Sequence, residues 1–151
     1  MKNNLAVIIL AAGKGTRMQS DIPKVLHKVN GKSMIKHVLG QTHNLKPEKI
    51  LVVIGYEAEQ VKKHLENHDI SYALQLQQHG TAHAVMQCES KLNTFKGSTL
   101  ILSGDVPLIK YETLQDLYNI HISKNAHATI LSAKVDNSYG YGRIIRQNNN
   151  F

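Results

Sequence analysis

A short loop near the N-terminus combines glycines with two cations. Residues 10–18 read Leu-Ala-Ala-Gly-Lys-Gly-Thr-Arg-Met. Gly13 and Gly15 can adopt backbone angles closed to other residues and let main-chain N–H groups approach an anion, while Lys14 and Arg17 add positive charge. The loop is therefore predicted to hold a polyphosphate.

The spacing within this loop separates it from two commoner phosphate loops. A dinucleotide fingerprint requires a third glycine where this chain has Met18. A Walker loop ends in Gly-Lys followed by Ser or Thr, and residues 10–18 lack that ending. We therefore interpret them as a third kind of phosphate loop.

A further cation follows a proline just beyond the loop. Pro23 fixes its own φ and biases Ile22 towards an extended conformation, so Lys24 is expected on a stiffened segment instead of a free arm. Such a lysine is suited to contact a phosphate.

Apolar runs alternate with helically spaced apolar residues along most of the chain. The predicted strands are residues 6–10, 49–54, 70–76, 99–102 and 128–135. The predicted helices run from a Ser33 cap to about Leu45 and then over residues 58–65, 82–92 and 111–118. Val29–Lys32 predicts a turn, and Gly140–Arg146 predicts a turn and the first arm of another strand.

Four successive strand-then-helix units indicate the fold class. Parallel strands need crossover connections, so the pattern predicts an α/β, Rossmann-like, mostly parallel sheet flanked by helices. Ligands of such sheets bind beyond the carboxyl ends of the strands. The loops after Leu10, Leu76 and Leu102 should therefore share one cleft.

Composition and charge limit the class of partner. The chain has 151 residues, which suits a single domain, and a formal net charge of +7. Residues 1–36 hold seven cations and one acid, and the remainder is nearly balanced. The chain has two Phe, six Tyr and no Trp, and so few aromatic residues disfavour a nucleic-acid surface. A compact polyanion such as a nucleoside triphosphate is a better candidate partner than a nucleic acid.

The sequence also favours a cytoplasmic protein without a membrane role. Cys88 is the single cysteine and cannot form an internal disulfide, and the N-terminus lacks a signal-peptide pattern. The longest apolar run, Leu5–Ala12, is far shorter than the roughly 20 residues needed to span a bilayer.

Taken together, the motifs resemble those of the sugar-nucleotide pyrophosphorylases, and within that group the N-acetylglucosamine-1-phosphate uridylyltransferases. The resemblance runs from about residue 5 to the end of the chain. It is carried by residues 10–18, Pro23–Leu26, Gln75, Gln78–Ala84, Gly104–Leu108 and Gly140–Arg143. It implies the nucleotide-diphospho-sugar transferase type of fold.

The resemblance also implies an activity. Such an enzyme joins UTP and N-acetylglucosamine 1-phosphate, releases pyrophosphate and forms UDP-N-acetylglucosamine for cell-envelope precursors such as peptidoglycan and lipopolysaccharide. Backbone N–H groups of Ala11–Gly15 would hold the triphosphate, Arg17 the β- and γ-phosphates, and Lys24 the α-phosphate. Asp105 would bind Mg²⁺, because a carboxylate is a hard oxygen ligand.

Binding of the base and the sugar is implied at other positions. Gln75 and the Gly80–Thr81 backbone would contact uracil, since a Gln amide offers both a donor and an acceptor. Gly140 would contact the sugar. The nucleotide and substrate contacts implied in full are Leu10, Ala11, Ala12, Gly13, Lys14, Gly15, Lys24, Gln75, Gly80, Thr81, Ser103, Gly104, Asp105 and Gly140.

Plainer interpretations stand beside these. Gln75 and Gln78 can be exposed polar residues at a strand end, and Cys88 a small packed residue. The pairs His64/His68 and His79/His83 lack a third ligand at a usual zinc spacing.

Residues 1–151 are expected to form a nucleotidyltransferase domain that is incomplete at its C-terminal end. The β-helix acetyltransferase domain of the family is absent from this chain, and the full-length relatives are homo-oligomers. The alternatives are a related nucleotidyltransferase for another nucleotide or sugar phosphate, and a noncatalytic nucleotide-binding fragment.

Overall fold

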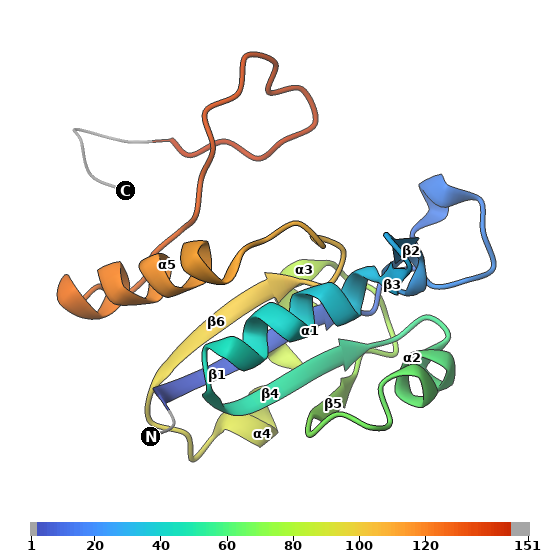
Figure 1. Ribbon diagram of the computed structural model, residues 1–151, viewed down its shortest axis with the longest axis horizontal. Helices are drawn as coiled ribbons and strands as arrows, with labels where there is room; N and C mark the ends of the chain where they lie inside the picture. Colours follow the sequence, from blue (N-terminus) through green and yellow to red (C-terminus); the bar gives the residue numbers. More distant parts are fainter. Residues whose placement is uncertain (1–2, 146–151) are drawn as a thin grey trace.

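The computed structural model describes residues 3–145, apart from the side chains of Asn3 and Arg17. In chain order the elements are β1 (Asn3–Ala11), η1 (Thr16–Met18), η2 (Lys24–Leu26), β2 (Lys28–Val29), β3 (Lys32–Ser33), α1 (Met34–Asn44), β4 (Pro47–Ile54), α2 (Ala58–His64), β5 (Ser71–Leu74), α3 (Thr81–Met86), α4 (Glu89–Leu92), β6 (Ser98–Ser103) and α5 (Tyr111–Ser123). Figure 1 shows the helices packed around one central sheet.

The sheet is parallel and has the strand order β5-β4-β1-β6. β1 lies inside it, with Val7 opposite Ile50 of β4 on one side and Leu100 of β6 on the other. The α/β class predicted from the sequence is confirmed. Because all four strands run the same way, their carboxyl ends meet at one edge.

The alternation of side chains along β1 supplies two apolar cores. Val7 and Ile9 face a cluster that includes residues of α1, α2 and α5. Ile8 faces a second cluster that includes Ala84 of α3 and Cys88. The sheet is covered on both faces, which is why β1 and β4 read as continuous apolar runs. The sheet separates α1 from α3 (Figure 1).

Most predicted elements lie where the sequence placed them, with two local differences. The helix predicted over residues 82–92 is split into α3 and α4, and Cys88 between them is buried. Ser33 precedes α1, but its hydroxyl contacts Nε2 of His64 at 2.8 Å and makes no capping bond to the helix. The turn at Val29–Lys32 is confirmed as a hairpin between β2 and β3, with positive φ at Asn30 and Gly31.

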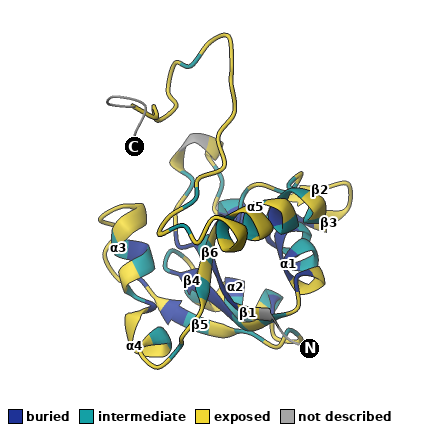
Figure 2. Cartoon of the chain, turned by 90° about the vertical axis from the view of Figure 1, so that its left-hand side faces the viewer, coloured by how far each residue is buried: buried dark blue, intermediate teal, exposed yellow. Residues whose placement is uncertain are grey.

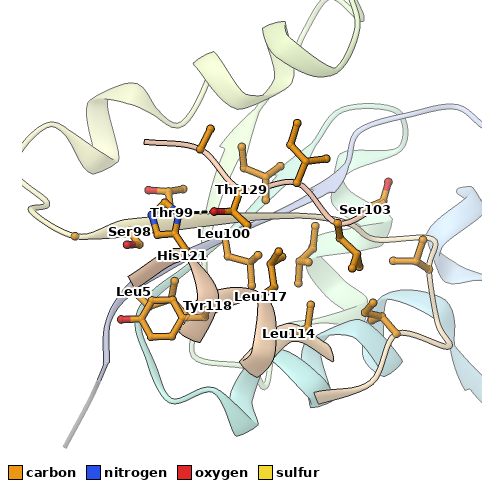
Figure 3. A pocket seen from close by; sticks show the side chains of 18 of the residues that line it. Leu5, Ser98, Thr99, Leu100, Ser103, Leu114, Leu117, Tyr118, His121 and Thr129 are labelled. Carbon is orange, nitrogen blue, oxygen red and sulfur yellow. Dashed lines mark hydrogen bonds between the residues drawn. The ribbon is translucent and has the colours of Figure 1, made fainter. Parts of the chain in front are cut away.

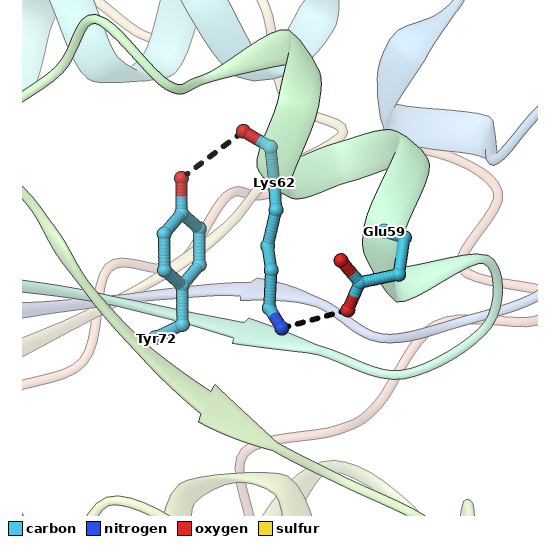
Figure 4. Close-up of polar contacts among 3 residues, drawn as sticks. All are labelled: Glu59, Lys62 and Tyr72. Carbon is cyan, nitrogen blue, oxygen red and sulfur yellow. Dashed lines mark hydrogen bonds and ion pairs between the residues drawn. The ribbon is translucent and has the colours of Figure 1, made fainter.

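A hydrogen bond fastens α2 to the neighbouring strand. The Tyr72 hydroxyl of β5 donates to the main-chain oxygen of Lys62, whose Nζ lies 2.7 Å from a carboxylate oxygen of Glu59 in the same helix (Figure 4). Burial raises the pKa of Tyr72, and the charge of Lys62 opposes that shift. The tyrosine therefore stays a neutral donor near neutral pH.

The strand predicted over residues 128–135 is not formed, so that prediction was wrong. Residues 126–145 contain no helix or strand, and part of this segment loops away from the sheet (Figure 1). Nδ1 of His121 lies 2.9 Å from the Thr129 hydroxyl oxygen, which fastens the start of the segment to α5. Ile130 is 65% exposed. β-Propensity does not make a strand without ladder bonds to a neighbour, and within residues 3–145 the outer edge of β6 stays unpaired.

The end of the described chain holds a turn. The Tyr141 N–H donates to the Ser138 carbonyl, but no strand follows in residues 142–145. Arg146, predicted to lie on that strand, falls outside the described residues. Figure 2 shows that exposed residues dominate this part of the chain. No helix within residues 3–145 has both the length and the apolar character required to traverse a bilayer.

Candidate functional site

Loops from different strands are bonded together at the carboxyl edge of the sheet. The Gly104 N–H after β6 donates to the Leu10 carbonyl of β1 at 2.9 Å. The Tyr56 N–H after β4 donates to the Ala12 carbonyl at 3.0 Å. These bonds place the glycine-rich loop between the loops that follow β4 and β6. Of these, the loop after Leu102 was predicted to share its cleft.

Lys24 and Asp105 form an ion pair at this edge. Nζ of Lys24 lies 2.5 Å from Oδ2 of Asp105, although 81 residues separate them in the chain. The 3₁₀ turn η2 holds the lysine, because the Leu26 N–H donates to the Pro23 carbonyl and the Val25 side chain is buried. The side chains of Lys24 and Asp105 are 41% and 28% exposed, so both can reach a ligand.

The charge state of Asp105 follows from its surroundings. Desolvation raises the pKa of this carboxyl, but the hydrogen bond and charge of Lys24, with smaller contributions from Ser103 and the backbone, outweigh it. The pKa is therefore lowered from 3.8, and Asp105 is a carboxylate at neutral pH.

Two glycines allow the loops to approach closely. Gly15 has φ +66°, and a Cβ on it would lie 2.7 Å from Cβ of Lys24. A Cβ on Gly104 would lie 2.9 Å from the carbonyl oxygen of Leu10. Larger residues at these positions would separate the loop from Lys24 and from β6.

Gly13 does not need glycine's special conformations. Its φ lies outside the left-handed region, and a Cβ on it would meet no atom within 4 Å, so the argument from backbone conformation holds for Gly15 and not for Gly13. Lys14 is exposed and its Nζ lies 5.3 Å from the centre of the Tyr56 ring. Tyr56 was missed by sequence reasoning, because only the fold brings the loop after β4 beside the loop after β1.

Gln75 is buried at the end of β5, with 3% of its surface exposed. Its Nε2 lies 3.2 Å from the Gly80 carbonyl oxygen and 3.0 Å from Nδ1 of His83. The plain interpretation of Gln75 as an exposed polar residue was wrong. The amide is fixed by the following loop and by α3.

The other predicted contacts divide into four groups. Ala11, Ala12 and Gly104 are buried, whereas Ser103, Gly80 and Thr81 are exposed. The Arg17 side chain is outside the described part of the structure. Gly140 lies within residues 126–145, part of which loops away from the sheet (Figure 1), and a Cβ on it would meet no atom within 4 Å beyond its chain neighbours.

A cavity of about 740 Å³ lies elsewhere, along the free edge of β6. It is bounded by β6, α5 and residues 127–131, with Leu100, Leu114 and Leu117 among its lining (Figure 3). No lysine or arginine among the described residues lines it. Its apolar walls do not suit a triphosphate, so we assign the candidate site to the charged edge instead.

An inner strand of this parallel sheet leads into a glycine-rich loop, and a lysine and a carboxylate from two further loops lie beside it. Such an arrangement is typical of nucleotide-binding α/β transferases. A family model described as Nucleotidyl transferase matches residues 6–150, and this chain belongs to that family.

Two relatives are close in sequence. The bifunctional protein GlmU of Prochlorococcus marinus (strain NATL2A) is 51% identical over 141 residues, covering 93% of this chain and 32% of the relative. The bifunctional protein GlmU of Enterococcus faecalis (strain ATCC 700802 / V583) is 51% identical over 146 residues, covering 97% of this chain and 31% of the relative. The chain thus spans about a third of the length of these curated relatives.

Solved structures share the fold at low sequence identity. A nucleotidyl transferase from Methanothermobacter has a TM-score of 0.64 at 21% identity, covering 76% of this chain and 56% of that one. The protein Rv0371c of Mycobacterium tuberculosis H37Rv, in complex with manganese, has a TM-score of 0.66 at 14% identity, covering 79% and 60%. These likenesses support the fold class.

Proposed function

We propose that this chain is the nucleotide-binding part of a cytoplasmic uridylyltransferase that makes UDP-N-acetylglucosamine and pyrophosphate from UTP and N-acetylglucosamine 1-phosphate. The observation that carries the proposal is the contact between Lys24 and Asp105 beside the glycine-rich loop. The identity of about half over nearly the whole chain to two GlmU proteins supports the choice of reaction.

The chemistry requires two anions to meet. An oxygen of the sugar phosphate attacks the α-phosphorus of UTP, and the bond from that phosphorus to the bridging oxygen of pyrophosphate breaks. Lys24 is proposed to leave Asp105 for the α-phosphate, where it offsets the charge that accumulates. Backbone N–H groups of Ala11–Gly15, with Lys14 and Arg17, are proposed to hold the remaining phosphates.

Asp105 suits a divalent cation. It is ionised and partly exposed, and hard oxygen ligands are those that Mg²⁺ prefers, commonly with substrate phosphates completing its coordination. When bound, Mg²⁺ would supply positive charge against the phosphates. The manganese complex of Rv0371c is consistent with a divalent-metal site in this fold.

One observation favours a second candidate, in which the isolated chain binds UTP without transferring it. Gly140, the implied sugar contact, lies within residues 126–145, part of which loops away from the sheet (Figure 1). The residues proposed to bind the nucleotide all lie within residues 10–105, whereas the proposed sugar contact lies outside that range.

Calorimetric titration with UTP and Mg²⁺, paired with a pyrophosphate-release assay with N-acetylglucosamine 1-phosphate, tests both candidates. Lys24→Ala should weaken UTP binding at least about tenfold, since charged hydrogen bonds contribute about 1.5–3 kcal/mol. Lys63→Ala, the same change on the exposed face of α2, is the matched control. Binding without release would support the second candidate, and equal effects of the two substitutions would refute the proposed site.

A further inference from the structure

Both ring nitrogens of His83 face the amide nitrogen of a glutamine. Nδ1 lies 3.0 Å from Nε2 of Gln75, and the ring Nε2 lies 3.2 Å from Nε2 of Gln87. Gln75 directly follows β5, while His83 and Gln87 are four residues apart at α3. One imidazole therefore lies between two amide groups.

The neighbouring carbonyl groups determine which end of each amide faces the ring. Nε2 of Gln75 is 3.2 Å from the Gly80 carbonyl oxygen, and Nε2 of Gln87 is 2.9 Å from the His83 carbonyl oxygen. A carbonyl oxygen only accepts hydrogen bonds, so an amide oxygen at either place would be repelled. Both amides must present N–H groups to His83.

A neutral imidazole can accept from only one of them. It has one acceptor nitrogen and one N–H. Gln75 makes the shorter contact, 3.0 Å against 3.2 Å, and is almost fully buried, whereas Gln87 is partly exposed. An unmet donor costs more when it is buried. The acceptor is therefore Nδ1, and Nε2 carries the hydrogen.

This tautomer decides what Gln75 can offer to a ligand. Its two N–H hydrogens are used by Gly80 and His83, and no group in the described part of the chain donates to Oε1. We propose that His83 is a positioning residue that holds the Gln75 amide so that its oxygen serves as the acceptor for the nucleobase. The inference rests on the proposed function of the same site.

The consequence is a preference between bases. Uracil carries N3–H, which can donate to Oε1, whereas cytosine has an unprotonated N3 that would oppose it. The sequence predicted that the Gln75 amide offers the base both a donor and an acceptor. With its N–H groups already used, it offers only the acceptor. Any donor to uracil O4 must come from another group.

The affinities of UTP and CTP for the full chain, with Mg²⁺, test the proposal in wild type and variants. His83→Leu removes the acceptor and lets the amide rotate, so UTP binding should weaken while CTP binding strengthens, and the ratio of Kd for CTP to Kd for UTP should fall about tenfold. His83→Asn places an amide oxygen near the position of Nδ1 and should keep the ratio within about threefold. Gln87→Leu is the control on the other ring nitrogen and should leave it unchanged.

The outcomes separate this inference from the proposed function. Equal weakening of both nucleotides by His83→Leu would mean a merely structural role and would overturn the proposal. ¹⁵N NMR of wild-type His83 measures the tautomer independently of any variant, and we expect the hydrogen on Nε2. A hydrogen on Nδ1 would overturn the proposal, even if His83→Leu fails to fold. A wild-type chain that binds neither nucleotide would refute the proposed function, while the tautomer measurement would still decide the amide orientation.

Discussion

Gly15 and Lys24 meet beside the glycine-rich loop with no room for a side chain between them. A Cβ on Gly15 would lie 2.7 Å from Cβ of Lys24, and Gly15 itself has φ +66°. The same glycine therefore satisfies a left-handed backbone and a close approach. The position of the lysine that contacts Asp105 depends on a residue without a side chain.

Gly15→Ala should impair both stability and nucleotide binding. The left-handed conformation costs an L-residue about 1–2 kcal/mol, and the new methyl group must displace Lys24. We expect a lower midpoint of urea unfolding and UTP affinity reduced by at least about tenfold. Gly13→Ala is the control, because Gly13 has neither a positive φ nor a close neighbour, and its effect on both measurements should be small. Equal effects of the two substitutions would contradict the close-packing argument.

Asp105 should give the chain a pH-dependent stability of known sign. Its folded pKa lies below 3.8, so the carboxylate stabilises the native state above that value, and the contribution is lost as the pH falls through the lower folded value. Wild type should be more stable than Asp105→Asn near pH 6, and the two should converge well below pH 3.8. Chemical denaturation at several pH values measures the difference, which we expect to be less than about 1 kcal/mol for a part-exposed pair.

Lys24, the ion-pair partner of Asp105, provides the check that it is the cause of the lowered pKa. In a Lys24→Met background, the advantage of Asp105 over Asp105→Asn near pH 6 should be lost or reversed, because the lysine that lowers the pKa is gone while the desolvation that raises it remains. An advantage of unchanged size without Lys24 would mean that another group sets the charge state of Asp105.

Lys14 should be partly restrained by Tyr56 before a nucleotide binds. Nζ lies 5.3 Å from the ring centre, and a cation–π contact at an exposed site contributes about 0.5–1 kcal/mol. If Lys14 must leave the ring to reach a phosphate, Tyr56→Leu should raise UTP affinity about two- to fivefold. In a Lys14→Ala background the same substitution should have no effect, and an unchanged increase there would disprove the link between the two residues.

The free edge of β6 should govern self-association. Within residues 3–145, β6 pairs with β1 alone, and its Ile101 is 47% exposed beside the apolar cavity. Ile101→Lys should reduce concentration-dependent association in sedimentation velocity, because a charge on an edge strand opposes pairing between chains. Ile120→Lys, which removes a similarly exposed isoleucine from α5, is the control and should have a smaller effect. UTP affinity should be unchanged in both.

Local patterns determined most of the fold. The apolar runs of β1 and β4 and the helical spacing of α1 and α5 predicted elements that the structure contains, because strands covered on both faces must be apolar throughout and a packed helix must present one apolar face. The Asn-Gly pair at residues 30–31 likewise determined its hairpin turn. The prediction from sequence failed at residues 128–135, where formation of a strand depends on ladder bonds to another strand and not on β-propensity.

For the candidate site too, some features could be predicted from the sequence and others were decided only by the tertiary structure. Residue types and spacing indicated a phosphate loop and a lysine suited to a phosphate at Lys24, since glycines and cations after a strand limit the chemistry. Asp105 and Gln75 were singled out by the resemblance to a family. Only the tertiary structure decided that Lys24 and Asp105 touch, that Tyr56 lies beside Lys14, and that His83 uses up a donor of Gln75. The first two are contacts between segments that follow different parallel strands, so they are set by the order and register of those strands, which no local stretch of sequence encodes. The third joins residues eight apart, and it depends on how the loop between β5 and α3 folds back onto Gln75.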